Sequence, residues 1–243
     1  MICLSFDTDH VDQRRMEEFV RDFPIPGVGT VFCTQRYEAL DGGRHELCPH
    51  PTLDPGSDWS EELDRKQAEF PDARGVRTHT LINSCNLSID FDRRGFEWVS
   101  ARDEPGRRGI APYREAWGVW HVPIYYMDTM DFSFSDYWPD VSAAPFAREL
   151  LETAIREPGT YVFDFHPIHL MLNSTSASAY LSRRDRFIAG EPLQEMRCEG
   201  YGAGDYYADL VALMGEADLE SVGISEALAA ATREEAFPAT GDR

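Results

Sequence analysis

Aspartate and histidine side chains recur where predicted strands end. The apolar runs 2–6, 45–48, 75–77 and 159–165 are predicted to be strands, and they lead, in this order, into Asp7 with Asp9, His50, His79 and His166. In parallel α/β folds the carboxyl ends of the strands converge on one face, and that face holds the active site. We therefore expect these side chains to lie close together.

The types of these side chains indicate which ion they would bind. Imidazole and carboxylate together suit zinc, and also cobalt, nickel or iron(II), whereas calcium and magnesium prefer shells of oxygen alone. Two histidines and one aspartate leave coordination positions open for water and substrate, as in a hydrolytic metal site. Each residue alone also has a structural explanation, because an Asp-x-Asp segment can cap a helix and a buried histidine can simply be paired. The pattern as a whole favours one divalent transition metal, with zinc expected first.

Alternating strands and helices are expected to position these residues. Further strands are predicted at 29–33, 96–100 and 117–123, and helices at 13–23, 60–70, 144–156, 204–214 and 224–235. Such alternation is typical of a parallel α/β fold. We find no internal repeat and no linker, so we expect one catalytic domain over residues 1–243.

Composition and charge limit which substrates and macromolecules we expect the protein to bind. The 243 residues include 23 basic and 43 acidic side chains, which gives a net charge of −20. Such a field repels phosphate backbones, so we expect a small-molecule or glycan substrate and no nucleic acid. No apolar run reaches the roughly 18 residues of a membrane span, and no leader precedes the first strand, so we expect a cytoplasmic protein. The five cysteines form no C-x-x-C pair and are expected to be free thiols.

Several segments resemble the polysaccharide deacetylases, carbohydrate esterase family 4. The resemblance rests on Phe6-Asp7-Thr8-Asp9 as the opening motif, on 29–33 as the second strand, on 45–51 as the segment of the first metal histidine, and on 161–166 as the last strand with its catalytic histidine. The segment 200–202 and the helix after it resemble the closing part of the family. The resemblance implies an α/β fold, an irregular (β/α)7 barrel, with a divalent metal.

The departures from the usual family pattern point to a divergent branch. In most members two adjacent aspartates precede a glycine, whereas here Thr8 separates them and His10 replaces the glycine. The position four residues after His50, where the family has its second histidine, is Asp54. Deacetylases of surface-polysaccharide gene clusters have a comparable F-D-x-D start and a separate R-S-H segment. The segment 77–79, Arg-Thr-His, resembles the latter, which makes His79 the second histidine ligand.

The resemblance implies roles for the individual residues. Asp9, His50 and His79 would bind the metal, and Asp7 would be the general base. His166 would be the general acid, with His169 sharing or orienting that role and Asp164 as a weaker orienting candidate. For substrate contact we expect Arg77, Trp120, Tyr125 and Tyr126, together with Trp138 as a further aromatic wall, although ordinary packing in an aromatic core explains the aromatic residues equally well.

The implied activity is metal-dependent hydrolysis of an N-acyl group, with an N-acetyl amino sugar or a sugar-containing intermediate as substrate. Two alternatives remain open at this stage. One is a metal-dependent amidohydrolase that acts on a non-sugar amide, and the other is a non-catalytic barrel that binds sugar.

Overall fold

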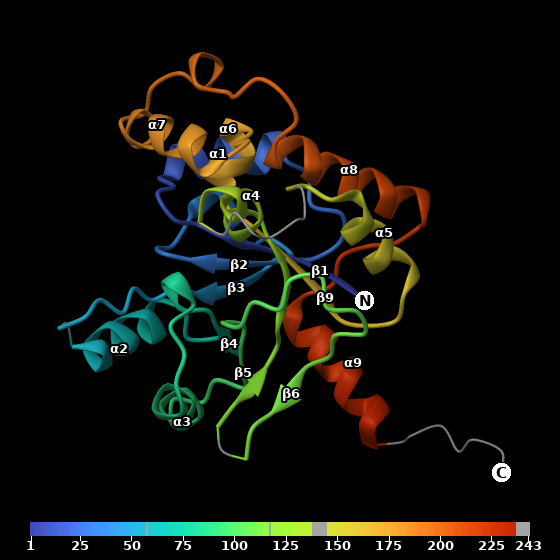
Figure 1. Cartoon of the computed structure of the whole chain (residues 1–243). Coiled ribbons are helices and arrows are strands. Elements are labelled where there is room, and N and C mark those ends of the chain that lie inside the picture. Colours follow the sequence, from blue (N-terminus) through green and yellow to red (C-terminus); the bar gives the residue numbers. More distant parts are fainter. Residues whose placement is uncertain (57, 117, 138–144, 237–243) are drawn as a thin grey trace, which may run out of the picture.

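A parallel five-stranded sheet lies at the centre of the computed structural model, which describes residues 1–56, 58–116, 118–137 and 145–236 (Figure 1). Its strands, in spatial order, are β3 (Glu46–Pro49), β2 (Gly29–Cys33), β1 (Ile2–Asp7), β9 (Tyr161–Phe165) and β8 (Ile124–Met127). Every residue of β1, β2 and β9 is buried, as expected for strands covered on both faces. The chain thus has the α/β architecture that its alternation predicts.

Both edge strands of this sheet, β3 and β8, are connected to a second sheet. It contains β4 (Gly75–Val76), β5 (Trp98–Val99), β7 (Trp120–His121) and the antiparallel β6 (Tyr113–Arg114). On one side the Arg77 amide donates to the Pro49 carbonyl at 3.3 Å, and on the other the Ile124 amide donates to the Arg102 carbonyl at 2.8 Å. These bonds link the end of β4 to β3 and the continuation of β5 to β8. The resulting curved wall corresponds to the irregular barrel implied by the resemblance.

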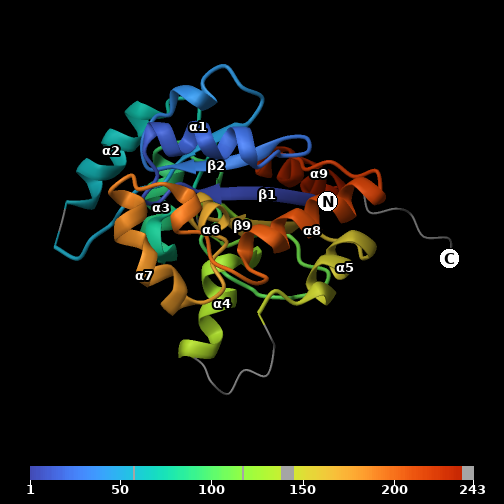
Figure 2. The same ribbon diagram turned by 90° about the horizontal axis from the view of Figure 1, so that it is seen from above.

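Helices pack around the two sheets. They are α1 (Gln13–Asp22), α2 (Trp59–Glu69), α3 (Cys85–Arg93), α4 (Asp128–Tyr137), α5 (Arg148–Arg156), α6 (Pro167–Leu172), α7 (Ala177–Ile188), α8 (Ala203–Glu216) and α9 (Ile224–Ala236). Figures 1 and 2 show α1, α6, α7 and α8 grouped on one side of the five-stranded sheet. None of the helices within the described ranges is both long and apolar enough to cross a membrane.

Apolar packing fixes the strand that carries the first aspartates. Phe6 of β1 contacts Phe19 of α1 and Tyr207 of α8 edge to face, with ring centroids 5.3 and 6.0 Å apart. Helix α1 begins where the sequence predicts, because the Asp12 carboxylate accepts a hydrogen bond from the Arg15 amide at 2.7 Å and caps the helix. The end of β1 is therefore held rigidly, and with it the site described below.

Two predicted strands are much shorter than expected, and the first of them, 96–100, is reduced to Trp98–Val99. The strand expected at 117–123 is reduced to Trp120–His121, and the next strand of the central sheet, Ile124–Met127, lies in a stretch for which no strand was predicted. Pro123 separates the two strands, since it has no amide hydrogen for a continuous ladder. Helices α3, α4, α6 and α7 were likewise not predicted.

We predict that Gly75→Ala destabilises the protein by about 1–3 kcal/mol, because overpacking a close-packed core displaces its neighbours. Gly75 of β4 pairs with Trp98 of β5, and a Cβ at this glycine would lie 2.1 Å from the buried Trp98 ring. Chemical denaturation monitored by Trp fluorescence measures the change. Gly215→Ala in α8 is the control: a Cβ there meets nothing within 4 Å, so it should be neutral or slightly stabilising. Equal effects of the two substitutions would contradict the prediction.

Candidate active site

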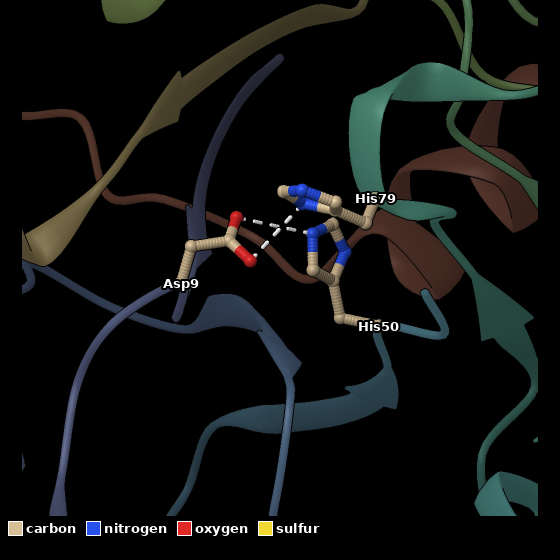
Figure 3. A group of neighbouring side chains, drawn as sticks. All are labelled: Asp9, His50 and His79. Atoms are coloured by element: carbon tan, nitrogen blue, oxygen red, sulfur yellow. Dashed lines mark ion pairs between the residues drawn. The ribbon is translucent and has the colours of Figure 1, made fainter. Parts of the chain in front are cut away.

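The ends of β1, β3 and β4 bring Asp9, His50 and His79 together (Figure 3). The Nε2 atom of His50 lies 3.3 Å from Oδ2 of Asp9, and Nδ1 of His79 lies 3.1 Å from Oδ1 of the same carboxylate. The two imidazole rings are nearly perpendicular, with centroids 5.6 Å apart. The residues predicted from the sequence to bind metal thus present one ligand atom each to a common space.

The surroundings of His50 provide a test of whether these residues fit a cation. Its ring is buried, and Nδ1 lies 2.9 Å from the Arg77 carbonyl oxygen, so the ring hydrogen at Nδ1 is donated there. In the neutral ring Nε2 then carries a lone pair, and this buried atom has no hydrogen-bond partner among the described residues. A lone pair that faces a carboxylate is satisfied by a cation between them. The three side chains therefore fit a divalent metal, and the carbonyl that fixes the tautomer is typical of such sites.

The charge state of Asp9 agrees with this reading. Burial alone raises the pKa of its carboxyl group, but the neighbouring His50 and His79 rings, when they are protonated, lower that pKa to well below its usual range. The carboxyl group is therefore ionised, which is the form that a metal binds.

The residues that follow two of these side chains have left-handed backbone conformations. His10, after Asp9, has φ of 61°, and Thr80, after His79, has φ of 56°. This region is uncommon for residues other than glycine, especially for β-branched ones, and such strain concentrates at functional sites. The value at His10 also gives a physical reason for the glycine that the resembled family has at this position.

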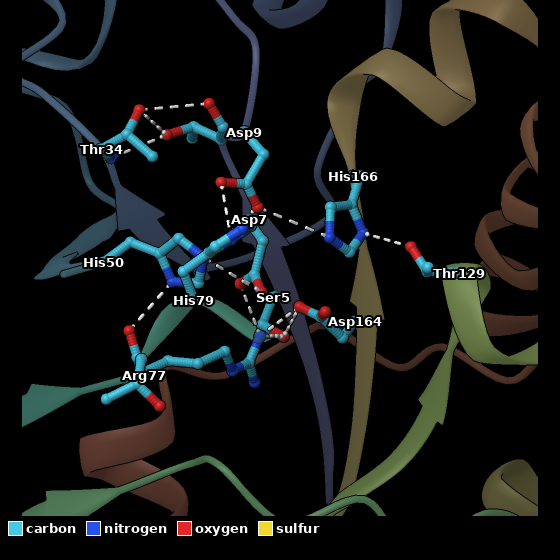
Figure 4. A network of polar contacts seen from close by, with 12 residues as sticks. Ser5, Asp7, Asp9, Thr34, His50, Arg77, His79, Thr129, Asp164 and His166 are labelled. Atoms are coloured by element: carbon cyan, nitrogen blue, oxygen red, sulfur yellow. Dashed lines mark hydrogen bonds and ion pairs between the residues drawn. The ribbon is translucent and has the colours of Figure 1, made fainter. Parts of the chain in front are cut away.

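Arg77 lies beneath the site and not at its surface (Figure 4). Its side chain is completely buried; the guanidinium binds Asp7 at 2.8 Å, contacts Asp164, and donates to the Ser100 carbonyl and hydroxyl groups at 2.7 and 2.9 Å. Burial alone lowers the pKa of Arg77, but Asp164 and Asp7 raise it above its ordinary value. The expectation that Arg77 contacts substrate is not supported, because its hydrogen bonds are made to the protein itself.

The sequence alone assigns Asp128 no catalytic, metal-binding or substrate-binding role. This residue follows β8, and its Oδ1 lies 2.8 Å from Nδ1 of His166 and 3.1 Å from Nδ1 of His169, while Oδ2 accepts a hydrogen bond from the His166 amide. Asp164, the orienting candidate from the sequence, instead accepts from the Ser5 hydroxyl and contacts Arg77. The same rule that found the other side chains, an acidic residue after an apolar run, would have found Asp128 had the run 124–127 been recognised as a strand.

The two histidines of the segment 166–169 differ in what they face. Nε2 of His166 points toward the metal ligands, 3.8 Å from Oδ2 of Asp9. Burial alone lowers the pKa of His166, but the Asp128 carboxylate raises it to about 10. His169 is buried between the rings of Tyr180 and Phe132, and burial lowers its pKa despite the contact with Asp128. Of the two, His166 is therefore the histidine whose Nε2 atom faces the residues that could bind a metal.

The aromatic candidates for substrate contact lie elsewhere. Tyr125 is buried and donates to the Leu150 carbonyl, and Tyr126 is buried against Tyr206, with ring centroids 4.9 Å apart. Trp120 packs against the core cluster that contains Trp98. Core packing, the alternative left open by the sequence, accounts for all three. Trp138 lies outside the described residues.

Comparisons with known proteins agree with the family resemblance of the sequence motifs. Residues 4–184 match the model of the family described as "WbmS-like: Polysaccharide deacetylase". No curated protein matches the chain. A Bordetella bronchiseptica structure, assigned as a polysaccharide deacetylase involved in O-antigen biosynthesis, is 22% identical with a TM-score of 0.70, over 87% of this chain and 89% of that one. A Mycobacterium smegmatis structure assigned as a polysaccharide deacetylase is 14% identical with a TM-score of 0.55, over 100% and 94%. These structures are similar in fold.

The backbone at His10 leads to a stability prediction. His10→Gly should raise the free energy of unfolding, because glycine adopts the left-handed region without strain. The gain should be at most about 1 kcal/mol, because glycine also loses more backbone entropy on folding. His10→Val should lower it, because a β-branched residue fits this region worst. Thermal unfolding of both variants measures the difference. A valine variant as stable as the glycine variant would contradict the strain at this position.

The position of Arg77 leads to a second prediction. Arg77→Met should lower the free energy of unfolding by about 3–5 kcal/mol, because two buried carboxylates lose their counter-charge. Arg93→Met, at an exposed position of α3, is the matched control and should change it by less than about 0.5 kcal/mol. Urea denaturation compares the two. A stable Arg77→Met protein impaired only in substrate affinity would restore the substrate-binding role.

Proposed function

The chain belongs to the WbmS-like polysaccharide deacetylase family, and from this membership we propose that it removes an N-acetyl group from an amino sugar, or from a sugar-containing intermediate, with the help of a divalent metal ion. The observation that carries the proposal is the unpartnered Nε2 of His50 facing the Asp9 carboxylate beside His79. Asp7 and His166 flank that space, so a base and an acid are both within reach of it.

Asp9, His50 and His79 would hold the metal. Their donor set of two imidazoles and one carboxylate suits zinc first, and cobalt, nickel or iron(II) as well. When bound, such an ion supplies Lewis acidity toward a carbonyl oxygen and activates water.

Asp7 is the proposed general base. Its Oδ1 is bound by Arg77 at 2.8 Å, whereas Oδ2 lies 3.8 Å from Nε2 of His50 and therefore faces the same space as the metal ligands. One oxygen is fixed by the guanidinium while the other remains free to accept a proton from attacking water.

His166 is the proposed general acid. Its Nδ1 atom is bound to Asp128, and this orients Nε2 toward Asp9 and the space between the strand ends. The leaving amine of an amide needs a proton as the C–N bond breaks, and a protonated Nε2 can donate it. His169 would support this arrangement by holding the same carboxylate.

We predict that Asp7→Asn keeps bound metal but loses about 10²–10⁴-fold of the turnover number, because asparagine cannot accept the proton. Amine release from a panel of free and nucleotide-linked N-acetyl amino sugars measures turnover, and elemental analysis measures metal content. His50→Ala should lose the metal, and Asp72→Asn, at an exposed position, is the control that should retain both.

Removal of the ion with a chelator should abolish amine release, and zinc or cobalt should restore it. Loss of metal in Asp7→Asn would show that the roles of Asp7 and Asp9 are exchanged. Absence of stoichiometric metal from the wild-type protein, or release from simple amides only, would overturn the proposal.

A further inference from the structure

Four donor atoms converge at the start of α4 and the start of α6, beside the metal ligands but outside that set. They are Asp128 Oδ1, Thr129 Oγ1, His166 Nδ1 and His169 Nδ1. Asp128 Oδ1 lies 2.8 Å from the His166 nitrogen, 3.1 Å from the His169 nitrogen and 3.3 Å from the Thr129 oxygen. The Thr129 oxygen lies 3.3 and 3.4 Å from the two nitrogens. Asp128, His166 and His169 also each offer an atom within 4.8 Å of the other two.

These separations are those of ligands around a small cation. Four ligands at about 2.0–2.1 Å from a tetrahedral zinc ion are about 3.3 Å from one another. Five of the six separations among these atoms are given above and span 2.8 to 3.4 Å, so little movement is needed to bring these pairs to the spacing of zinc ligands.

The hydrogen-bond pattern of Asp128 gives an independent reason. Four groups face Oδ1, because the Thr129 amide donates to it at 2.6 Å in addition to the Thr129 hydroxyl and the two imidazoles. A carboxylate oxygen has about two lone-pair sites. Oδ2 meanwhile accepts the His166 amide at 2.8 Å. The four groups that face Oδ1 therefore cannot all donate hydrogen bonds to it at once. A cation would leave Oδ1 with two partners, the ion and the Thr129 amide.

From this geometry we propose that Asp128, Thr129, His166 and His169 form a second cation site, selective for ions of the zinc class. Two imidazoles and a carboxylate exclude calcium and magnesium as preferred ions. The site is buried on the Asp128 and His169 side, while His166 retains 12% exposure and Thr129 is half-buried, which leaves a path for entry.

Occupation of this site would affect catalysis, and this consequence alone rests on the proposed function. An ion on Nδ1 of His166 replaces the hydrogen bond to Asp128 that orients the general acid. Zinc in excess of the first equivalent should therefore slow turnover.

Zinc-soaked wild-type crystals and Co²⁺ titrations test the second site. We expect two anomalous peaks at the zinc edge, one beside Asp9 and one between Asp128, His166 and His169, and two equivalents of Co²⁺ in the absorption titration. His169→Gln and His79→Gln are matched substitutions in the second and first sites, and each should bind one equivalent.

A single peak beside Asp9 in the wild-type crystal would overturn the proposal, whatever the variants do. Two equivalents bound by His169→Gln would also overturn it, as would no binding by His79→Gln. If His169→Gln does not fold by circular dichroism, the wild-type map decides. Failure of the peak beside Asp9 would count against the proposed function instead, so the two proposals fail separately.

Discussion

The buried guanidinium of Arg77 is the interaction on which the rest of the site depends. The guanidinium binds Asp7 at the end of β1, Asp164 in β9 and Ser100 after β5. Its central carbon, Cζ, lies 4.0 Å from the centre of the Phe32 ring in β2. Four strands that are distant in sequence are thereby fixed at their carboxyl ends. A charge in such a position is tolerated only when it is paired and hydrogen-bonded, so the ends of these strands must meet in one arrangement.

The backbone of the same residue controls the neighbouring histidine. Its carbonyl accepts the Nδ1 hydrogen of His50 at 2.9 Å and so directs Nε2 toward Asp9. One residue therefore compensates the charge of Asp7 through its side chain and selects the tautomer of His50 through its main chain. The charge compensation of Asp7 and the orientation of His50 are coupled, because both depend on how β4 lies against β3.

The sequence predicts the general fold and the side chains at the strand ends, because alternation and strand-end placement are local patterns. Asp9, His50 and His79 follow from that reasoning. Asp128 does not, because Pro123 hides the boundary between two short strands, so that the run 124–127 before Asp128 is not recognised as a strand. The burial of Arg77 and Tyr125 could not be inferred either: it depends on contacts between residues far apart in sequence, such as Arg77 with Asp164.

The spread of Asp9, His50 and His79 over three strands has a thermodynamic consequence. Ligands from one loop can retain an ion after the remainder of a protein has melted, but these three come together only when β1, β3 and β4 are assembled. An ion held by them would bind the folded chain and not the unfolded one, and its binding free energy would add to the cooperativity of the whole sheet. Retention of the ion would then show that the whole sheet is folded. Destabilising mutations far from the site would lower the apparent affinity for metal.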